Sequence, residues 1–379
     1  MWVFVFFVIQ PRGAHLTGQL HLLLAPKERF EPGGAGAFAL NVVETSCVSR
    51  FRDAITVFGS PVGTPFDGVR FQPLQKARWW EGDRNKAMAR RYAEHAATNL
   101  PGLVEVYNRP IMVDVLRRAL ITAPIALHFG NDPRTMDGSR SVVARRELLQ
   151  QSSAIVCVSE FIRRCFLDGI HDPLSALVQV IHTGVPYPQT LPPKEKRIVY
   201  VGRVVPEKGV LELVRALARV LSRYPDWSAE IIGARWFGTG EKPTAYENFV
   251  ARAAASCDRI VLSGFRPHDD VLDSLGRAAI AVVPSLWDDP FPRTALEALA
   301  QGCTLVSSTR GGLPELGPER ALYLEFVSAE SLSGALEQLI ADADRRNDLQ
   351  RRGREDFPFD IRRTTSRLDD LRERLMSPP

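Results

Sequence analysis

The 379-residue sequence predicts an α/β protein of two Rossmann-like, doubly wound domains that face a cleft. Three observations support this fold class. The chain exceeds the roughly 250–300 residues at which a single hydrophobic core stops growing. Short apolar runs bounded by turn residues alternate with longer amphipathic runs, which is the pattern of parallel strands covered by helices. The alternation stops once, at a proline-rich stretch, and then restarts, so two such domains are expected in series.

The composition is that of a globular enzyme, with 45% hydrophobic and 24% charged residues. It excludes a disordered chain, a collagen-like fibre and a coiled coil. The 48 basic and 44 acidic residues leave a net charge of +4, which gives no reason to expect a nucleic-acid partner. The five cysteines are scattered and form no C-x-x-C pair. We therefore expect no disulfide framework, no zinc site and a cytoplasmic location.

Residues 1–18 stand apart from the rest of the sequence. Their apolar run at residues 2–9 is shorter than the about 20 residues that cross a bilayer. The run also lacks the basic start and the cleavage site of a signal peptide. We expect residues 1–18 to be an extension of uncertain order outside the first domain.

Residues 19–186 are predicted to form the first Rossmann-like domain. Apolar runs typical of buried parallel strands lie at residues 20–25, 54–58, 104–107, 125–129, 155–159 and 178–182. Helical patterns between them lie at residues 36–49, 84–97 and 139–151. Strands that alternate with helices in this way form βαβ units and a parallel sheet.

A linker is predicted at residues 187–196, because residues 185–194 contain four prolines and show no periodicity. The second Rossmann-like domain is expected at residues 197–358. Its predicted strands are residues 198–201, 229–232, 260–262, 281–283 and 304–307. Its predicted helices are residues 208–222, 244–255, 271–278, 294–300 and 329–341. Residues 359–379 should hold a final amphipathic helix at 361–376. Ligands of such sheets bind beyond the carboxyl ends of the strands, so the cleft between the domains is the expected site.

The first loop that could carry chemistry is E-P-G-G-A-G-A-F at residues 31–38. Adjacent glycines let a ligand approach the backbone, and a helix amino terminus offers N–H groups to a phosphate. Gly34, Gly36 and Ala39 also match the dinucleotide pattern G-x-G-x-x-A, but a long loop precedes them where that pattern needs a tight turn. The loop favours another anionic ligand over a nicotinamide cofactor, and a flexible loop without a ligand is the third possibility.

The second loop, G-R-V-V-P-E-K-G, follows the first predicted strand of the second domain. Arg203 and Lys208 lie five positions apart at the carboxyl end of that strand. Such a pair suits a diphosphate, with a guanidinium fork and a point charge. The alternative is a solvated loop with ordinary surface cations.

The third loop is the most informative, and it also follows a predicted strand. Asp289 lies in the loop and Glu297 in the first turns of the helix that Pro292 opens. Both carboxylates can therefore face one cleft and accept hydrogen bonds from sugar hydroxyls. The alternative is a capped helix with exposed acids. A second glycine loop, which contains Gly311 and Gly312, follows the next predicted strand.

A basic and aromatic run, K-A-R-W-W-E-G-D-R-N-K-A-M-A-R-R, occupies residues 76–91. Six cations against two acids could contact anionic lipid head groups, which would make the protein peripheral at the inner face of the membrane. The alternative is a solvated helix face with two tryptophans at a turn.

The order of these motifs resembles the GT-B glycosyltransferases of family 4 (glycosyl transferase group 1). The resemblance covers roughly residues 20–376 and rests on G-G, G-R-x-x-x-x-K-G, D-P-F-P-R-T-A-L-E-A-L-A-x-G and G-G-L-P-E in this order. It implies a retaining enzyme that moves a sugar from a nucleotide-diphosphate sugar to a saccharide or lipid-linked saccharide. The form W-x-D-x-F-P-R-T resembles a bacterial branch that works on surface or exported polysaccharides. The terminal helix would cross back onto the first domain.

The resemblance also implies roles for individual residues. Arg203 and Lys208 would bind the donor diphosphate, while Asp289 would contact the donor sugar and take part in catalysis. Glu297 would bind the nucleotide ribose. The remaining donor-binding positions would be Gly34, Phe291, Pro292, Gly311 and Gly312.

In the first domain, the resemblance places His128 beside the reacting carbon, although a histidine after apolar residues is often simply buried. Glu105, Asn108 and Arg109 follow another predicted strand and are candidates for acceptor binding. No cofactor and no catalytic metal are expected, because Arg203 and Lys208 supply the charge that a metal supplies elsewhere.

Two substitutions distinguish this chain from the common pattern of the family. Asp289 replaces a glutamate and is one methylene shorter, and Pro292 replaces a glycine and so lacks an N–H group. Three other functions stay open: a sugar-nucleotide 2-epimerase on the same fold, an NAD(P)-dependent oxidoreductase and a non-catalytic carbohydrate-binding protein.

Overall fold

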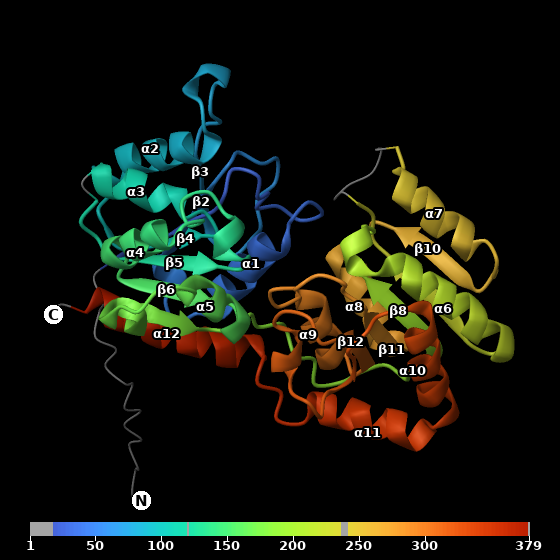
Figure 1. The fold of residues 1–379 in the computed structure, drawn as a ribbon. Helices are drawn as coiled ribbons and strands as arrows, with labels where there is room; N and C mark the ends of the chain where they lie inside the picture. The colour runs from blue at the N-terminus through green and yellow to red at the C-terminus, as the bar shows by residue number, and fades with distance from the viewer. Residues whose placement is uncertain (1–17, 120, 236–241, 378–379) are drawn as a thin grey trace, which may run out of the picture.

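The computed structural model describes residues 18–119, 121–235 and 242–377. The chain forms two α/β domains side by side, and each is built on one parallel sheet with helices on both faces (Figure 1). The predicted fold class is confirmed. The extension predicted at residues 1–18 lies outside the described residues, apart from Gly18.

The first sheet has seven strands in the order β3-β2-β1-β4-β5-β6-β7. Its strands are β1 (Gln19–Leu23), β2 (Ile55–Gly59), β3 (Arg70–Pro73), β4 (Pro101–Tyr107), β5 (Ile125–Phe129), β6 (Ala154–Cys157) and β7 (Val178–Val180). The helices of this domain are α1 (Ala37–Val48), α2 (Arg84–Ala96), α3 (Ile111–Arg118), α4 (Val142–Gln151) and α5 (Glu160–Leu167).

The second sheet has six strands in the order β10-β9-β8-β11-β12-β13. Its strands are β8 (Glu195–Val201), β9 (Ser228–Ile232), β10 (Ile260–Gly264), β11 (Ala278–Val283), β12 (Thr304–Ser308) and β13 (Ala321–Leu324). The helices that follow in the chain are α6 (Val210–Arg223), α7 (Ala245–Ala254), α8 (His268–Arg277), α9 (Arg293–Ala300), α10 (Ala329–Ala341), α11 (Ala343–Arg354) and α12 (Ile361–Met376).

Five of these elements were not predicted. The strands β3 and β13 are edge strands whose side chains are mostly exposed or half-buried, so neither shows a clear apolar run. The helices α3 and α5 have eight residues each, too few for a periodic pattern to stand out. In α11, Gly353 is the one buried residue, so this helix shows no apolar stripe.

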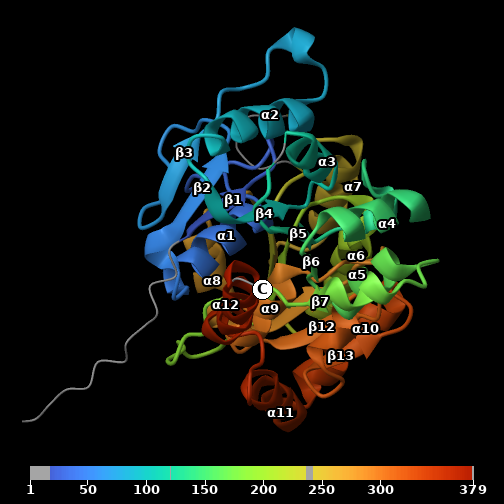
Figure 2. The same ribbon diagram turned by 90° about the vertical axis from the view of Figure 1, so that its left-hand side faces the viewer.

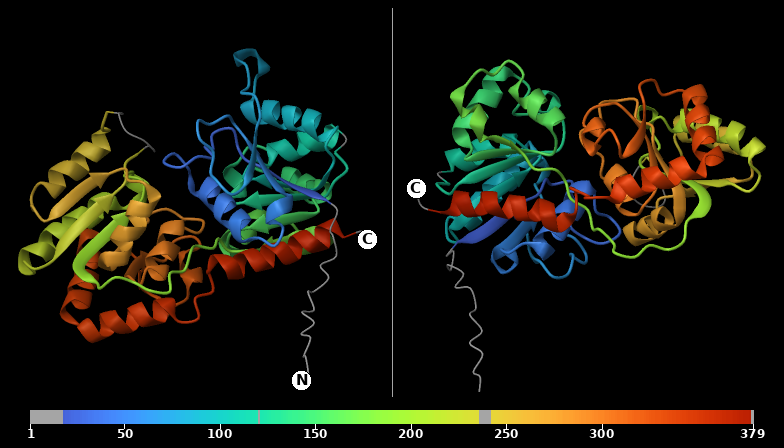
Figure 3. Two further views of the ribbon diagram at one scale, coloured as in Figure 1. Left: turned by 180° about the vertical axis from the view of Figure 1, so that it is seen from behind. Right: turned by 90° about the horizontal axis from the view of Figure 1, so that it is seen from below.

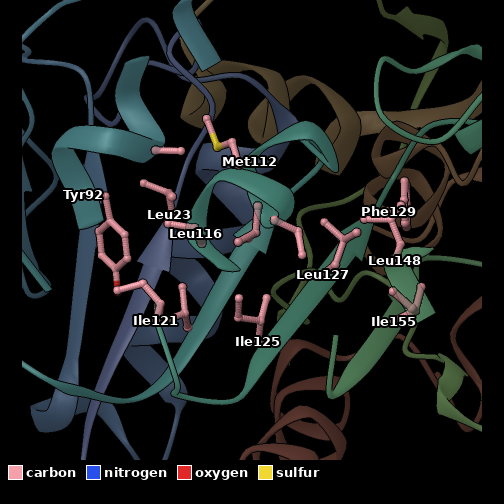
Figure 4. Packing of buried hydrophobic residues seen from close by; sticks show 14 of the residues in the cluster. Leu23, Tyr92, Met112, Leu116, Ile121, Ile125, Leu127, Phe129, Leu148 and Ile155 are labelled. Atoms are coloured by element: carbon pink, nitrogen blue, oxygen red, sulfur yellow. The ribbon is translucent and has the colours of Figure 1, made fainter. Parts of the chain in front are cut away.

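The two faces of the first sheet carry different cores. Along β5 the side chains of Ile125, Leu127 and Phe129 pack toward α3, α4 and α5 in a hydrophobic cluster (Figure 4). Alternation along a strand turns His128 to the other face, toward α1 and α12. This register decides where the His128 imidazole lies.

The final helix, α12, leaves the second domain and runs along the underside of the first (Figures 1 and 3). It packs against α1 and β4, where its Arg372 is fully buried and binds Glu105 of β4. At its start, Val185 and Asp360 form an isolated β-bridge. The stretch predicted as a linker ends in β8, which already begins at Glu195. No helix in the described ranges is long and apolar enough to cross a membrane.

Candidate active site between the domains

An open cleft of about 1040 Å³ separates the two domains at the carboxyl ends of their strands. The first domain lines it with residues that follow β1, β4 and β5 and with the start of α2. The second domain contributes Arg203, Trp287 and Asp288. Loops that the sequence places far apart therefore meet at one site.

The loop after β8 and the loop after β11 support each other. The amide of Leu286 donates to the carbonyl oxygen of Glu207 at 2.9 Å. Gly209 has φ +67°, and a Cβ atom there would clash with the carbonyl oxygen of Pro284. A glycine is required at this close approach, and it brings the side chain of Lys208 next to the third loop.

Lys208 and Asp289 form an ion pair at the base of this loop pair. Asp289 is buried, and its Oδ2 also accepts a hydrogen bond from Ser285 Oγ at 3.1 Å. The ammonium of Lys208 lies 5.4 Å from the centre of the Trp287 ring. Arg203 is exposed on the cleft wall, 3.8 Å from Glu207. Of the predicted donor-binding cations, Arg203 lines the cleft, whereas Lys208 and Asp289 pair with each other next to the cleft-lining residues Trp287 and Asp288.

Glu297 lies deeper than expected. It is buried in α9, where its Oε1 accepts hydrogen bonds from Arg293 Nε at 2.6 Å and His268 Nε2 at 2.7 Å. Burial alone would raise the pKa of Glu297, but Arg293 and His268 outweigh it and lower the pKa. The expectation that both carboxylates face the cleft is not met by their exposure: neither Asp289 nor Glu297 lines the cleft, and the Glu297 carboxylate is held inside a charged cluster.

This cluster also joins the two domains. Arg293 Nη2 donates to Glu44 Oε1 of α1 at 2.5 Å, so α9 is bound to a helix of the first domain. Sequence reasoning missed Arg293, Glu44 and His268. The four-residue spacing of Arg293 and Glu297 was a usable signal, whereas no local pattern marks the other two.

Pro292 and Phe291 form the entry to α9. Pro292 is the residue that precedes α9. Its side chain has no hydrogen-bond acceptor, so it does not cap the first amides of the helix. The Phe291 ring is buried against the rings of His182 at 4.8 Å and Phe359 at 5.3 Å. The predicted donor role of Phe291 is thus confined to its main chain, because its side chain packs in the domain junction.

Gly311 and Gly312 support the Asp289 loop. Gly311 has φ +61°, and a Cβ atom on it would clash with the main chain of Asp289. The Gly312 amide donates to the carbonyl oxygen of Asp289 at 2.8 Å. Their close packing against residues 289 and 290 accounts for both glycines without a ligand. The structure therefore assigns them to the positioning of Asp289.

The segment after these glycines binds the first domain. Glu315 accepts hydrogen bonds from the amides of Glu160 and Phe161 at the start of α5, both at 2.8 Å. Ser159 Oγ donates to the carbonyl oxygen of Pro290 at 2.8 Å. The Asp289 loop is thus tied to both domains.

Gly34 lies in the loop before α1, half-buried beside the guanidinium of Arg29. Gly36 is the residue that precedes α1. Neither glycine is among the residues that line the cleft, where Pro26 and Lys27 represent this loop.

The structure places His128 away from the cleft. Its buried ring stacks on Tyr107 at 4.3 Å and lines a small cavity with Phe38 and Asn41. Burial lowers the pKa of His128 to about 4, so the imidazole is neutral at pH 7. Its Nε2 has no hydrogen-bond partner among the described residues and lies 3.7 Å from Glu105 Oε2. His128 is not among the residues that line the cleft, and its catalytic role stays a prediction.

Two of the three predicted acceptor residues are structural. Glu105 is buried and accepts two hydrogen bonds from Arg372 at 2.8 and 2.9 Å and one from Tyr107 Oη at 2.7 Å. Asn108 has φ +55°, and its Oδ1 accepts from the Gly130 amide at 3.2 Å. These contacts occupy the Glu105 carboxylate and Asn108 Oδ1, and an acceptor role for the two residues stays a prediction. Arg109 does line the cleft.

Sequence reasoning missed several residues on the first-domain wall of the cleft. Their shared signal is a position just after a predicted strand. They include Lys27, Asn131 and Asp132. Asp342, from the single D-x-D of the chain, caps α11 by accepting from the Arg345 amide. Across the described part of the chain, no three His, Cys, Asp or Glu side chains gather as a possible metal site.

Comparisons with known proteins identify the second domain and the fold. Residues 187–356 match the family described as "Glycosyl transferases group 1". The protein YtcC of Bacillus subtilis (strain 168), a glycosyltransferase by name, is 24% identical over 337 residues, which cover 82% of this chain and 80% of YtcC. The second domain is thus a glycosyltransferase group 1 domain, and the chain is a transferase.

Two solved structures share the fold. HepE of Anabaena, crystallised with UDP-glucose, has a TM-score of 0.72 and 16% identity over 94% of this chain and 99% of HepE. Sucrose-phosphate synthase from Thermosynechococcus elongatus has a TM-score of 0.74 and 19% identity over 94% of this chain and 99% of that enzyme. The two-domain architecture is therefore the GT-B fold.

Proposed function

We propose that this transferase is a retaining glycosyltransferase of family 4 that moves a sugar from a nucleotide-diphosphate sugar to a saccharide or lipid-linked saccharide. We place it in the synthesis of cell-surface polysaccharide. The observation that carries the proposal is Arg203 on the cleft wall together with the ion pair of Lys208 and Asp289 next to the cleft-lining Trp287 and Asp288. A cationic pair and a buried carboxylate at that point suit a diphosphate and a sugar hydroxyl, respectively.

The chemistry follows from these charges. Departure of the nucleoside diphosphate places negative charge on the leaving oxygens, and cations held close to that point lower the barrier. We assign this role to Arg203 and Lys208. Because Lys208 is neutralised by Asp289 in the structure, donor binding would exchange partners: the diphosphate takes Lys208, and a sugar hydroxyl takes Asp289.

The donor class is supported by the GT-B neighbours, since HepE was crystallised with UDP-glucose. UDP-sugars are therefore the first donors to test. For the acceptor, Arg109, Asn131 and Asp132 offer polar groups on the opposite wall of the cleft. The comparisons do not favour the 2-epimerase or the oxidoreductase.

We also propose that the enzyme acts in the cytoplasm at the inner face of the membrane, through residues 76–91. The five cysteines are all free in the structure, as a reducing compartment would keep them.

Donor binding is tested by thermal shift with UDP, GDP and ADP and their sugars. One nucleotide should raise the melting temperature, because a ligand at about 100 times its Kd stabilises by roughly 2.7 kcal/mol. Lys208→Ala should weaken that nucleotide about ten- to a hundredfold in calorimetry, since a charge-assisted hydrogen bond is lost.

The matched control for this test is Lys196→Ala. Lys196 also belongs to β8, but it is exposed and pairs with Asp226. Its removal should leave nucleotide affinity unchanged. Equal affinities in wild type, Lys208→Ala and Arg203→Ala would contradict the assigned diphosphate site.

Transfer should continue in the presence of EDTA. The leaving diphosphate would be stabilised by Arg203, Lys208 and the amides at the start of α9, so no divalent cation is needed for charge balance. The measurement is initial rate with and without chelator. Loss of turnover with EDTA and its return with Mg²⁺ or Mn²⁺ would show that this charge balance is wrong.

A further inference from the structure

Residues 74–83 form a projecting loop between β3 and α2, which we call the tryptophan tip. The tip rises above α2, away from the body of the first domain, in Figures 1 and 2. Trp79 is 91% exposed and Trp80 is 60% exposed, although both carry large apolar rings. Among the described residues, Trp79 is the most exposed large hydrophobic side chain.

The tip is held in shape at its base. Trp79 and Trp80 lie in a 3₁₀ turn whose Glu81 side chain accepts from the Arg78 amide. Arg91 of α2 binds the same carboxylate with hydrogen bonds of 2.6 and 2.8 Å. The two exposed rings are therefore presented by a braced turn.

The residues of the basic run at 76–91 differ in their exposure: some are buried or paired within the domain, and others are exposed to solvent. Within α2, the side chains of Ala87, Met88 and Ala89 are buried in the domain, and Arg91 is engaged by Glu81. The exposed cations of the run lie in the tip, at Lys76 and Arg78, and on α2, at Arg84, Lys86 and Arg90. The predicted contact surface over residues 76–91 is thus narrowed to the tip and these five cations.

Exposed tryptophans with exposed cations nearby, such as Arg78 at 5.3 Å from the centre of the Trp80 ring, match the chemistry of an anionic bilayer surface. Indole rings favour the boundary between head groups and acyl chains, and lysine and arginine are attracted by anionic lipids. The rings of Trp79 and Trp80 meet edge to face, at 5.6 Å and 89°. They form no continuous flat face on which a saccharide chain could stack, so a membrane is the better occupant.

The tip is continuous with the mouth of the cleft. Gly82, Asp83 and Arg84, at the base of the tip and the start of α2, line the cleft wall. A tip set into a lipid surface would hold that wall beside the head groups. The acceptor side of the site would then lie next to any lipid-linked substrate.

We propose that the tryptophan tip inserts Trp79 and Trp80 into the head-group region of an anionic membrane and presents the cleft to a lipid-linked acceptor. The membrane contact stands on the tip alone, whereas the acceptor part rests on the proposed function. The two parts are tested by separate measurements.

The first measurement is sedimentation of the full chain with vesicles of mixed phosphatidylcholine and phosphatidylglycerol. The double variant Trp79→Ser/Trp80→Ser should lose binding about tenfold or more, since the interfacial anchors are gone. Phe326→Ser is the matched control, because Phe326 is 79% exposed in the second domain, and it should bind like wild type. Tryptophan emission of the wild type should shift to the blue on vesicles, and the double variant should lose this shift.

The second measurement concerns charge. Lys76→Glu/Arg78→Glu should weaken vesicle binding, and Arg215→Glu, an exposed site on α6, should not. Binding of wild type should fall as salt rises above about 0.1 M, where the Debye length is near 10 Å. Equal binding to pure phosphatidylcholine would overturn the role of charge.

Two results would overturn the membrane contact itself: vesicle binding by the double variant that equals wild type, or no vesicle binding by wild type. Binding of a soluble polysaccharide that needs both tryptophans would identify a saccharide surface instead.

The proposed function is tested separately, by nucleotide binding and by transfer to a water-soluble acceptor. If the double variant keeps nucleotide binding and transfer to the soluble acceptor but loses vesicle binding, the docking role is supported. A wild type that binds vesicles but binds no nucleotide refutes the function and leaves the contact standing.

Discussion

Replacement of Asp289 by alanine is expected to reduce sugar transfer about ten- to a hundredfold, the effect of one lost hydrogen bond to a charged acceptor. Affinity for the bare nucleoside diphosphate should stay unchanged or rise. The reason is the ion pair with Lys208: without Asp289, the diphosphate no longer competes with a carboxylate for that ammonium. Calorimetry with nucleotide and initial rates with the full donor separate the two effects.

Glu297→Ala should behave differently, with weaker binding of both the bare nucleotide and the intact donor. This follows if Glu297 serves the ribose. Because the substitution also removes the partner of buried Arg293 and of His268, Glu297→Gln is the cleaner variant. Glutamine preserves the side-chain volume and a hydrogen-bond acceptor. The affinities for the bare nucleotide and for the intact donor should therefore fall in Glu297→Gln as well, but by a smaller factor.

The control acid is Glu330, an exposed residue of α10 that pairs with Arg219. Glu330→Ala should change neither measurement. The division of roles would be wrong if Asp289→Ala weakened the bare nucleotide as much as Glu297→Ala does. The two acids would then serve only the structure of the loop and of α9.

Arg372→Met should destabilise the protein by about 3–5 kcal/mol, the usual cost of leaving a buried charge without its partner. Arg372 is fully buried, and it donates to Glu105 and, at 2.9 Å, to Asp369. Urea or thermal unfolding measures the loss. The double variant Arg372→Met/Glu105→Gln should recover part of it, because one of the stranded charges is removed as well.

The destabilisation caused by Arg372→Met should depend on pH. Burial would raise the pKa of Glu105, but Arg372 outweighs it and lowers the pKa to about 2. In the wild type this stabilisation is present above the ordinary pKa of a glutamate, and it is lost as the pH falls toward 2. Without Arg372, burial dominates and raises the pKa, so protonation relieves the variant as the pH falls. The stability gap should therefore narrow between pH 7.5 and about pH 5.

Arg351→Met serves as the control for this pair. Arg351 is exposed on α11 and binds Asp348 and Glu355, and a surface pair of this kind contributes about 0–1 kcal/mol. A loss in Arg372→Met no larger than in Arg351→Met would show that α12 is not anchored by this residue.

The buried strands were predictable because burial on both faces of a parallel sheet leaves continuous apolar runs in the sequence. Such runs marked β5 with its observed limits and β9 to within one residue. The edge strands β3 and β13 were missed because their side chains are largely exposed or half-buried. The polar helix α11 was missed because it has no apolar stripe.

The sequence alone also determined where chemistry could occur. Gly209 next to Lys208, and Asp289 ahead of α9, lie after strands whose carboxyl ends must meet at one edge of a parallel sheet. The succession of strands and loops along the chain was sufficient for this inference. In a parallel sheet, the loops after the strands lie at the same edge regardless of how the side chains pack.

The tertiary structure alone decided what each side chain does there. Glu105 lies within β4 and His128 near the end of β5, yet α12, from the far end of the chain, covers that face and supplies Arg372 to Glu105. In the same way, Glu44 of α1 reaches Arg293 and so fixes the surroundings of Glu297. Partners separated by more than 200 residues leave no periodic signal in the sequence. Whether a carboxylate faces a ligand or a buried arginine is therefore settled only when the chain is folded.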